Sequence, residues 1–355
     1  MPGFASALAE RGCAVTVLTP DKAGAKETPA SYSVRWFAWA GSSKPLVDFS
    51  LGSPADLVLV LSLLRAGERA LKRLIEEERI DACLALWAVP SGYLAWRTRR
   101  RGVPYSVWAL GSDIHTWARR PLVGRLIRSI LKMANHRFAD GLELCAEVTA
   151  ISGRECQFLP TTRRLPEAAA LPNQLGTGVN FLFVGRLELV KGADVIVEAM
   201  TRLIAAGIDA RLTICGNGSL EPALRARIEA AGVGDRVTSL SSQPGDVVAA
   251  YMLACDCLVI PSRMESIPIV FSEALQARIP LLVTDVGDMG ELARKHGLPD
   301  PVPPGDPTAL ASAMKAFALD RDGHVSAYLA ARETLMALFD LGATADRYLA
   351  AIGRA

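Results

Sequence analysis

The sequence predicts an α/β protein built from two doubly wound domains, each a parallel sheet with helices on both faces. Three observations predict this fold class. The chain of 355 residues is long enough for two cores, short apolar runs alternate with longer amphipathic segments, and glycine-rich turns follow several of the apolar runs. Half of the residues are hydrophobic and 21% are charged, which is typical of globular proteins. We expect domains at 1–170 and 171–355, with the last helix packing back on the first domain.

The first half begins with a helix rather than a strand. The pattern predicts helices over 4–12, 55–78 and 91–101, strands over 14–18, 81–86 and 104–110, and short strand-like pieces at 150–153 and 158–160. A doubly wound domain ordinarily starts with a strand and a glycine-rich turn, and here only Met1, Pro2 and Gly3 precede the first helix. We therefore expect a first domain that lacks its first strand, joined to the second by a linker over 161–172.

The second half is more regular. Apolar runs predict strands over 180–184, 211–215, 236–240, 257–260 and 280–284, with helices over 195–206 and 222–231. After the strand at 257–260, Ser266 is a candidate N-cap and Pro268 suits the first turn of another helix. The helix N-terminus at this turn would present backbone amides, which bind anions.

Charge is unevenly distributed between the two halves. Residues 1–170 contain 23 basic and 16 acidic side chains, whereas residues 171–355 contain 16 basic and 21 acidic ones. Much of the excess lies in 116–137, where arginines and a lysine alternate with apolar residues. We expect a solvated helix face packed on the sheet, and a helix that lies on an anionic membrane surface is the alternative.

Cysteine and histidine are distributed in a way that argues against a metal centre. The seven cysteines occur singly except Cys255 and Cys257, which point to opposite faces of one strand, and the four histidines are scattered. We expect reduced, buried thiols in a cytosolic protein. The longest apolar run, 57–64, is too short to span a bilayer, and no secretory signal precedes the first helix.

Charged and flexible residues follow four strands of the second half. They are Gly185 with Arg186 and Lys191, the turn Gly216-Asn217-Gly218, the loop from Ser262 to Ser266, and the turn at Val286-Gly287-Asp288. In open parallel sheets, ligands bind beyond the carboxyl ends of the strands. Cations and a helix N-terminus suit a diphosphate, and carboxylates at Glu265 and Glu273 suit the hydroxyl groups of a ribose and of a second polyhydroxylated group.

The order and spacing of these residues resemble a known family. Val184-Gly-Arg-Leu-(x3)-Lys-Gly192, then Gly216-Asn-Gly218, then Glu265-(x7)-Glu273, resemble the pattern of glycosyltransferase family 4 across the whole second half. The first half is similar more weakly, through 11–18, Trp87-(x2)-Pro-Ser-Gly92 and Leu110-Gly-Ser-Asp113. The resemblance implies the GT-B fold, in which two Rossmann-like domains face a cleft, and transfer of a nucleotide-activated sugar with retention of configuration.

The resemblance also implies a role for each matching residue. Arg186 and Lys191 would neutralise the donor diphosphate, Glu273 would hold the ribose hydroxyls, and Glu265 would contact the transferred sugar. Further donor contacts would come from Gly185, Gly216, Gly218, Ser266, Ile267, Ile269 and Val270, and from Asp113 in the first domain. No metal or other cofactor is implied, and the co-substrate would be a UDP- or GDP-linked sugar.

The sequence departs from the family pattern in three places, and the first two keep a second interpretation open. The expected first domain lacks its first strand and most of the glycine-rich loop that the family places near the donor and acceptor. Leu110 occupies a position where the family often has histidine, and Ser266 replaces a common glycine. Competing motifs are weaker: Gly216-Asn-Gly-Ser-Leu-Glu221 lacks the third glycine of a dinucleotide site, and Asp320-Arg-Asp322 follows a helix far along the chain. We therefore predict a metal-independent glycosyltransferase, with a non-catalytic nucleotide-sugar-binding or partner-binding relative as the alternative.

The partners follow from that prediction. They are a nucleotide-sugar donor and an acceptor hydroxyl on a glycan or a lipid-linked saccharide, with contact to an anionic membrane as a hypothesis and no role for nucleic acid. The two-carboxylate chemistry of glycosidases requires an acid and a base that flank one bond. Here the resemblance implies that the two glutamates serve different parts of one donor.

Overall fold

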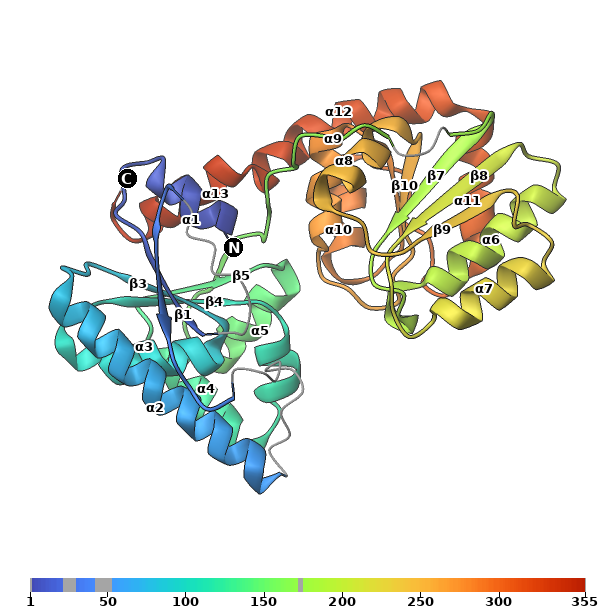
Figure 1. The fold of residues 1–355 in the computed structure, drawn as a ribbon. Coiled ribbons are helices and arrows are strands. Elements are labelled where there is room, and N and C mark those ends of the chain that lie inside the picture. Colours follow the sequence, from blue (N-terminus) through green and yellow to red (C-terminus); the bar gives the residue numbers. More distant parts are fainter. Residues whose placement is uncertain (1, 22–29, 42–52, 172–174, 355) are drawn as a thin grey trace. The chain divides into compact units, whose positions relative to one another are not determined.

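The structure is a computed structural model that describes residues 2–21, 30–41, 53–171 and 175–354 (Figure 1). The chain divides into two compact units. The first comprises Met1–Leu159 together with Thr344–Ala355, and the second comprises Pro160–Ala343. The last helix, α13 (Leu341–Ala351), therefore begins in the second unit and continues into the first.

The first unit contains two parallel sheets. Strand β1 (Thr16–Pro20) pairs with β2 (Ser33–Phe37), and a separate four-stranded sheet has the order β3-β4-β5-β6. Its strands are β3 (Cys83–Leu86), β4 (Tyr105–Ala109), β5 (His136–Ala139) and β6 (Gln157–Phe158). Its helices are α1 (Pro2–Ala9), α2 (Pro54–Glu77), α3 (Tyr93–Thr98), α4 (Pro121–Met133) and α5 (Leu142–Ser152), with short turns η2 (Trp87–Gly92), η3 (Arg99–Arg101) and η4 (Asp113–Trp117).

Two expectations for the first unit were wrong. The basic segment 116–137 is not one helix: α4 ends at Met133, Ala134 turns extended, and β5 begins at His136. Only the last two residues of β5 are buried, so the strand carries no apolar run that marks it in the sequence. The strand-like piece at 150–153 is the last turn of α5, which Gly153 closes with a φ of +65°.

The second unit is built on a five-stranded parallel sheet in the order β11-β10-β7-β8-β9. The strands are β7 (Val179–Val184), β8 (Ala210–Cys215), β9 (Val237–Leu240), β10 (Cys257–Ile260) and β11 (Leu281–Val283). The helices are α6 (Ala193–Ala205), α7 (Glu221–Ala230), α8 (Gly245–Ala254), α9 (Ile269–Ala277), α10 (Gly287–His296), α11 (Pro307–Leu319) and α12 (Arg321–Phe339), with the turn η5 (Leu189–Lys191). Within the described residues, no helix is long and apolar enough to cross a membrane.

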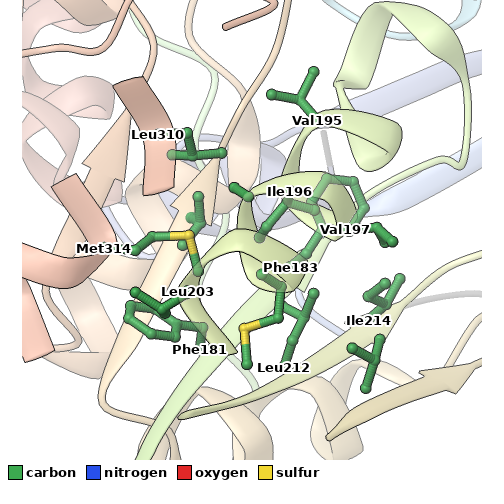
Figure 2. Packing of buried hydrophobic residues seen from close by; sticks show 14 of the residues in the cluster. Phe181, Phe183, Val195, Ile196, Val197, Leu203, Leu212, Ile214, Leu310 and Met314 are labelled. Atoms are coloured by element: carbon green, nitrogen blue, oxygen red, sulfur yellow. The ribbon is translucent and has the colours of Figure 1, made fainter. Parts of the chain in front are cut away.

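Alternation along the strands explains why helices cover both faces of this sheet. Phe181 and Phe183 on β7 point to the same face, and Figure 2 shows them packed with side chains of α6 and α11, including Ile196 and Met314. The intervening Leu182 is also fully buried, so the opposite face is covered as well. Figure 1 shows α6, α7 and α11 on one side of the sheet and α8, α9 and α10 on the other. This is a doubly wound domain.

The strand order contains a topological switch point. From β7 the chain continues to β8 and β9 on one side, and it then returns to place β10 and β11 on the other side. Strands β7 and β10 are neighbours, and the loops that follow them at the carboxyl edge lead away from each other, toward opposite sides of the sheet. In doubly wound sheets, a ligand crevice forms at this point.

All six tryptophans lie in the first unit, which allows the two cores to be followed separately. Leu212 and Ile127 are fully buried in the second and first units, and replacing either with alanine should cost about 2–5 kcal/mol of unfolding free energy. We expect Leu212→Ala to shift part of the transition seen by far-UV circular dichroism and to leave the tryptophan fluorescence transition in place. Ile127→Ala should shift the fluorescence transition. One common transition that both variants move equally would show that the units unfold as one.

Candidate functional site

Four loops meet at the carboxyl edge of the second sheet. They follow β7, β8, β10 and β11, whose register pairs Val184 with Cys215 and Ile260 with Val283. Because all five strands are parallel, these loops lie at one edge, where the sequence predicts a ligand site. The loops carry Gly185 to Gly192, Gly216 to Gly218, Pro261 to Pro268 and Thr284 to Gly287.

The loops after β7 and β8 approach each other too closely for side chains. A Cβ atom added to Gly216 would lie 1.9 Å from the carbonyl oxygen of Gly185, and one added to Gly218 would lie 2.5 Å from that of Leu187. The Leu187 amide donates to the carbonyl of Asn217 at 2.8 Å. These glycines therefore allow backbone contact between the two loops, which fixes the loop that carries Arg186.

The loops after β7 and β10 are fastened together at the switch point. Gly192 has a φ of +72°, and a Cβ atom there would lie 1.9 Å from the Pro261 carbonyl oxygen. The guanidinium of Arg263 donates two hydrogen bonds of 2.7 Å to the carboxylate of Asp194. The backbone amide of Arg263 donates to the carbonyl of Val190 at 2.8 Å. Hydrogen bonding to Asp194 raises the pKa of Arg263. Burial raises the pKa of Asp194, but Arg263 outweighs it and the net pKa lies below its usual value.

The predicted catalytic residues Lys191 and Glu265 lie next to each other. The Lys191 ammonium forms an ion pair with the Glu265 carboxylate, and their side chains are 21% and 19% exposed. Arg186 follows β7 and is exposed, and no ion pair joins it to a carboxylate of the described residues. At this edge, Lys191 is therefore paired with Glu265 and Arg263 with Asp194, and Arg186 forms no ion pair within the described residues.

Glu265 and Ser266 are held by the turn after β11. Gly287 has a φ of +49°, and a Cβ atom there would lie 2.0 Å from the Glu265 carbonyl oxygen. The Ser266 hydroxyl lies 3.0 Å from a carboxylate oxygen of Asp288, which is 2% exposed. Ser266 is not an N-cap, because α9 begins at Ile269 with Pro268 at its cap position and no side-chain cap. Two further extended residues separate Ser266 from the helix.

Glu273 is almost fully buried and is already paired. It is 2% exposed and forms an ion pair with Arg163, whose side chain is 52% exposed. Gln276, one turn further along α9, donates to the carbonyl of Arg163 at 2.8 Å and accepts from the amide of Leu165 at 2.8 Å. Sequence reasoning missed Arg163 because it stands 110 residues before Glu273, in a segment with no periodicity.

The remaining predicted donor contacts are distributed as follows. At the start of α9, Ile267 is 8% exposed, Val270 is half-buried and Ile269 is 38% exposed. Asp113 belongs to the first unit, where it is 1% exposed and accepts hydrogen bonds from the amides of Ala88 at 2.7 Å and Leu110 at 3.3 Å. The second unit therefore contains every predicted site residue except Asp113.

Metal ligands do not gather in the described part of the chain. Among those residues, no group of three or more histidine, cysteine, aspartate or glutamate side chains could hold an ion. Asp320 of the Asp-Arg-Asp sequence accepts from the amide of Gly323 at 3.1 Å and caps α12. All seven cysteines are free thiols, and burial raises the pKa of Cys215 and Cys255 to about 12.

Two family models match the chain, one in each half. Residues 173–334 match the model for glycosyl transferases group 1, and residues 2–157 match the glycosyl transferase 4-like domain. The chain belongs to the group 1 glycosyltransferases. The family prediction made from the sequence is confirmed.

Solved structures and one curated relative extend this result. Sucrose-phosphate synthase from Thermosynechococcus elongatus is similar with a TM-score of 0.77 and 19% identity, over 99% of this chain and 91% of that chain. HepE from Anabaena, solved with UDP, has a TM-score of 0.69 and 16% identity, over 92% and 87% of the two chains. These likenesses confirm the GT-B fold.

Among curated relatives, the 2-deoxystreptamine glucosyltransferase of Streptomyces kanamyceticus is 29% identical over 276 residues, which are 70% of this glycosyltransferase and 70% of that protein. Relatives with 31–37% identity are matched over shorter segments, and the chain spans only 25–43% of their length. In these relatives the matched segment is therefore only part of each protein.

The close approach at Gly192 gives a test with a matched control. Gly207 has nearly the same φ, +74°, but a Cβ atom there would meet nothing within 4 Å. Gly207→Ala should therefore cost only the left-handed backbone strain, about 1–2 kcal/mol. Gly192→Ala should cost clearly more, because Pro261 must also move. Urea denaturation of both variants measures the difference, and equal losses would show that the contact with Pro261 does not constrain the site.

Proposed function

We propose that this protein transfers a sugar from a nucleoside diphosphate sugar to a hydroxyl group of a glycan or lipid-linked saccharide, with retention of anomeric configuration and without a metal ion. The second unit would bind the donor, and the first unit, residues 1–159 with the end of α13, would bind the acceptor. Membership of the group 1 glycosyltransferases and the glucosyltransferase named above support transfer rather than mere binding.

One observation carries the proposal. At the switch point of the second sheet, the exposed Arg186 and the Lys191–Glu265 ion pair lie on loops whose backbones touch through Gly192, Gly216 and Gly218. Two cations on rigid backbone are suited to a diphosphate, and they need not reorganise when negative charge develops on the leaving group. The solved complex of HepE with UDP supports a UDP-linked sugar as the donor, and a GDP-linked sugar is the alternative.

The geometry suggests a division of labour among the charged residues. Arg186 and Lys191 would stabilise the departing nucleoside diphosphate, and Lys191 would exchange its ion pair with Glu265 for the donor phosphates. Glu265, released from that pair, would accept hydrogen bonds from hydroxyls of the transferred sugar. The backbone amides at the start of α9, near Ile269 and Val270, would contribute further donors to phosphate.

Turnover tests this assignment. With a panel of UDP- and GDP-linked sugars, we expect nucleoside diphosphate release with at least one donor. Lys191→Ala and Glu265→Ala should lower that release about a hundredfold or more, because each removes charge that acts at the reacting centre. Lys315→Ala and Glu229→Ala, which change exposed charges on α11 and α7, are the matched controls.

Three results would contradict parts of the proposal. Nucleoside diphosphate release that is unchanged in both Lys191→Ala and Glu265→Ala would contradict the roles assigned to these residues. Protection of the protein from thermal unfolding by a nucleotide sugar, without any release, would favour the non-catalytic relative. Strong inhibition by a metal chelator would contradict metal independence.

The pairing of Glu273 with Arg163 gives a second test, on UDP binding alone. If Glu273 holds the ribose, Glu273→Ala should weaken UDP binding about 10- to 100-fold, the value of hydrogen bonds to a charged group. Arg163→Ala should leave UDP binding unchanged or tighter, since it removes a competitor for the carboxylate. Gln276→Ala is the control, because it frees the 163–165 backbone without changing charge.

Isothermal titration calorimetry with UDP separates the two roles of Glu273. If Arg163→Ala and Gln276→Ala both reproduce the loss caused by Glu273→Ala, the carboxylate serves to anchor the 163–165 segment and does not hold ribose.

Contact with an anionic membrane is a further part of the proposal. The exposed face of α4 carries Arg125, Arg128 and Lys132, none of which forms an ion pair within the described residues, and Leu122 beside them is 79% exposed. Each such cation contributes about 1 kcal/mol near an anionic surface. Co-sedimentation should be stronger with phosphatidylserine vesicles than with phosphatidylcholine vesicles and weaker for Arg125→Glu/Arg128→Glu. Equal binding to both vesicles would count against it.

A further inference from the structure

Trp87 is an exposed aromatic residue directly after strand β3 of the first unit. It is 39% exposed, and in the described part of the chain no other tryptophan, tyrosine or phenylalanine is exposed. Large aromatic side chains are usually buried for most of their area, and where they stay exposed they commonly bind ligands. Trp87 lies at the carboxyl end of a parallel strand, the edge at which such sheets bind ligands.

The backbone at Trp87 is strained. Its φ is +65°, in the left-handed region that costs an ordinary residue about 1–2 kcal/mol. Among the described residues, the other non-glycine residue with positive φ is Arg278, which ends helix α9, where such a conformation is common. Trp87 has no such role, because it directly follows strand β3 and is the first residue of the turn η2. Strained residues persist where surrounding contacts fix them, and they cluster at ligand sites.

Asp113 supplies the contact that fixes this turn. One carboxylate oxygen accepts from the amide of Ala88, the residue after Trp87, at 2.7 Å, and the other accepts from Leu110 at 3.3 Å. Ala88 and Asp113 are 0% and 1% exposed. Burial raises the pKa of Asp113, although backbone hydrogen bonds oppose the shift. The carboxylate thus accepts hydrogen bonds from backbone amides on both sides of the site, as expected of a residue that positions the turn at Trp87.

The segment that Asp113 joins to Trp87 also presents polar groups. His115 lies two residues after Asp113, its amide donates to Gly111 at 2.8 Å, and its side chain is 44% exposed. Its Nδ1 atom is 3.3 Å from a carboxylate oxygen of Glu147, which is 33% exposed. The turn η4, which carries His115, contacts the turn η2, which begins at Trp87. An apolar indole, an imidazole and a carboxylate are the groups that suit a sugar ring, which has apolar C–H faces and a rim of hydroxyls.

We propose that Trp87 is the stacking platform of a saccharide acceptor subsite, with His115 and Glu147 as hydrogen-bonding partners and Asp113 as the residue that positions the platform. This inference rests on the proposed glycosyl transfer, and it names the acceptor as a sugar ring rather than a lipid or a non-sugar alcohol. Replacing Trp87 with alanine should weaken binding of a saccharide about five- to tenfold, the value of an aromatic contact.

Fluorine NMR of the full protein labelled with 5-fluorotryptophan tests the proposal. The Trp87 signal is assigned by its loss in Trp87→Phe. Methyl α-D-glucopyranoside, methyl α-D-mannopyranoside and N-acetyl-D-glucosamine are then added separately, with and without UDP. We expect at least one sugar to shift the Trp87 signal in a saturable way and to leave the signal of the buried Trp108 unchanged. No response of Trp87 to any of the three would overturn the subsite.

Asp113→Asn tests the positioning role, because it keeps the shape of the side chain and removes its charge. The Trp87 signal of the free protein should move or broaden while the Trp108 signal stays, and the sugar response should weaken. An unchanged Trp87 signal in Asp113→Asn would refute the positioning role.

The outcome also separates this inference from the proposed function. UDP that protects the protein from thermal unfolding, together with a silent Trp87, would refute the subsite and leave the donor site intact. A responding Trp87 without any effect of UDP or GDP would support the sugar subsite and refute the donor assignment.

Discussion

Contact between two backbones at one point in the second sheet determines the geometry of the candidate site. The loops after β7 and β10 separate at the switch point, and they are rejoined where Gly192 lies against the Pro261 carbonyl and Arg263 binds Asp194. Lys191 precedes the glycine by one residue, and Glu265 follows the arginine by two. The side chains that meet in the Lys191–Glu265 pair are therefore placed by contacts in which neither takes part.

In the free protein, the two important carboxylates of the second unit are both neutralised by cations of the same unit. Glu265 is paired with Lys191 and the buried Glu273 with Arg163. An ionised carboxylate that is as deeply buried as Glu273 would cost folding free energy if it had no partner. The Arg163 guanidinium supplies that partner. If these carboxylates bind the donor as proposed, binding requires an exchange of partners, and the net affinity is a difference between two sets of hydrogen bonds.

The sequence was a good guide wherever local chemistry sets the structure. The β7–β11 strands and the loops that carry Arg186 and Gly216 were predicted because buried parallel strands are continuous apolar runs. The strand β5 was missed because two of its four residues are only half-buried. Pairings such as Arg163 with Glu273 join segments distant in the chain, and no local pattern encodes them. The hydrogen bonds that Asp113 accepts from Ala88 and Leu110 are likewise visible only in the structure, and its predicted contact with the donor stays a prediction.

The glycines of the second unit have a consequence for reading mutational data. Gly192, Gly216, Gly218 and Gly287 have no side chain, yet a Cβ atom at each would lie within 2.5 Å of a neighbouring carbonyl oxygen. A scan that scores every position by loss of function would rank them with Lys191 and Glu265. A glycine that is needed because no side chain fits can be told from a residue whose functional group is needed. The test is a series of substitutions that increase in size, not one that varies in polarity.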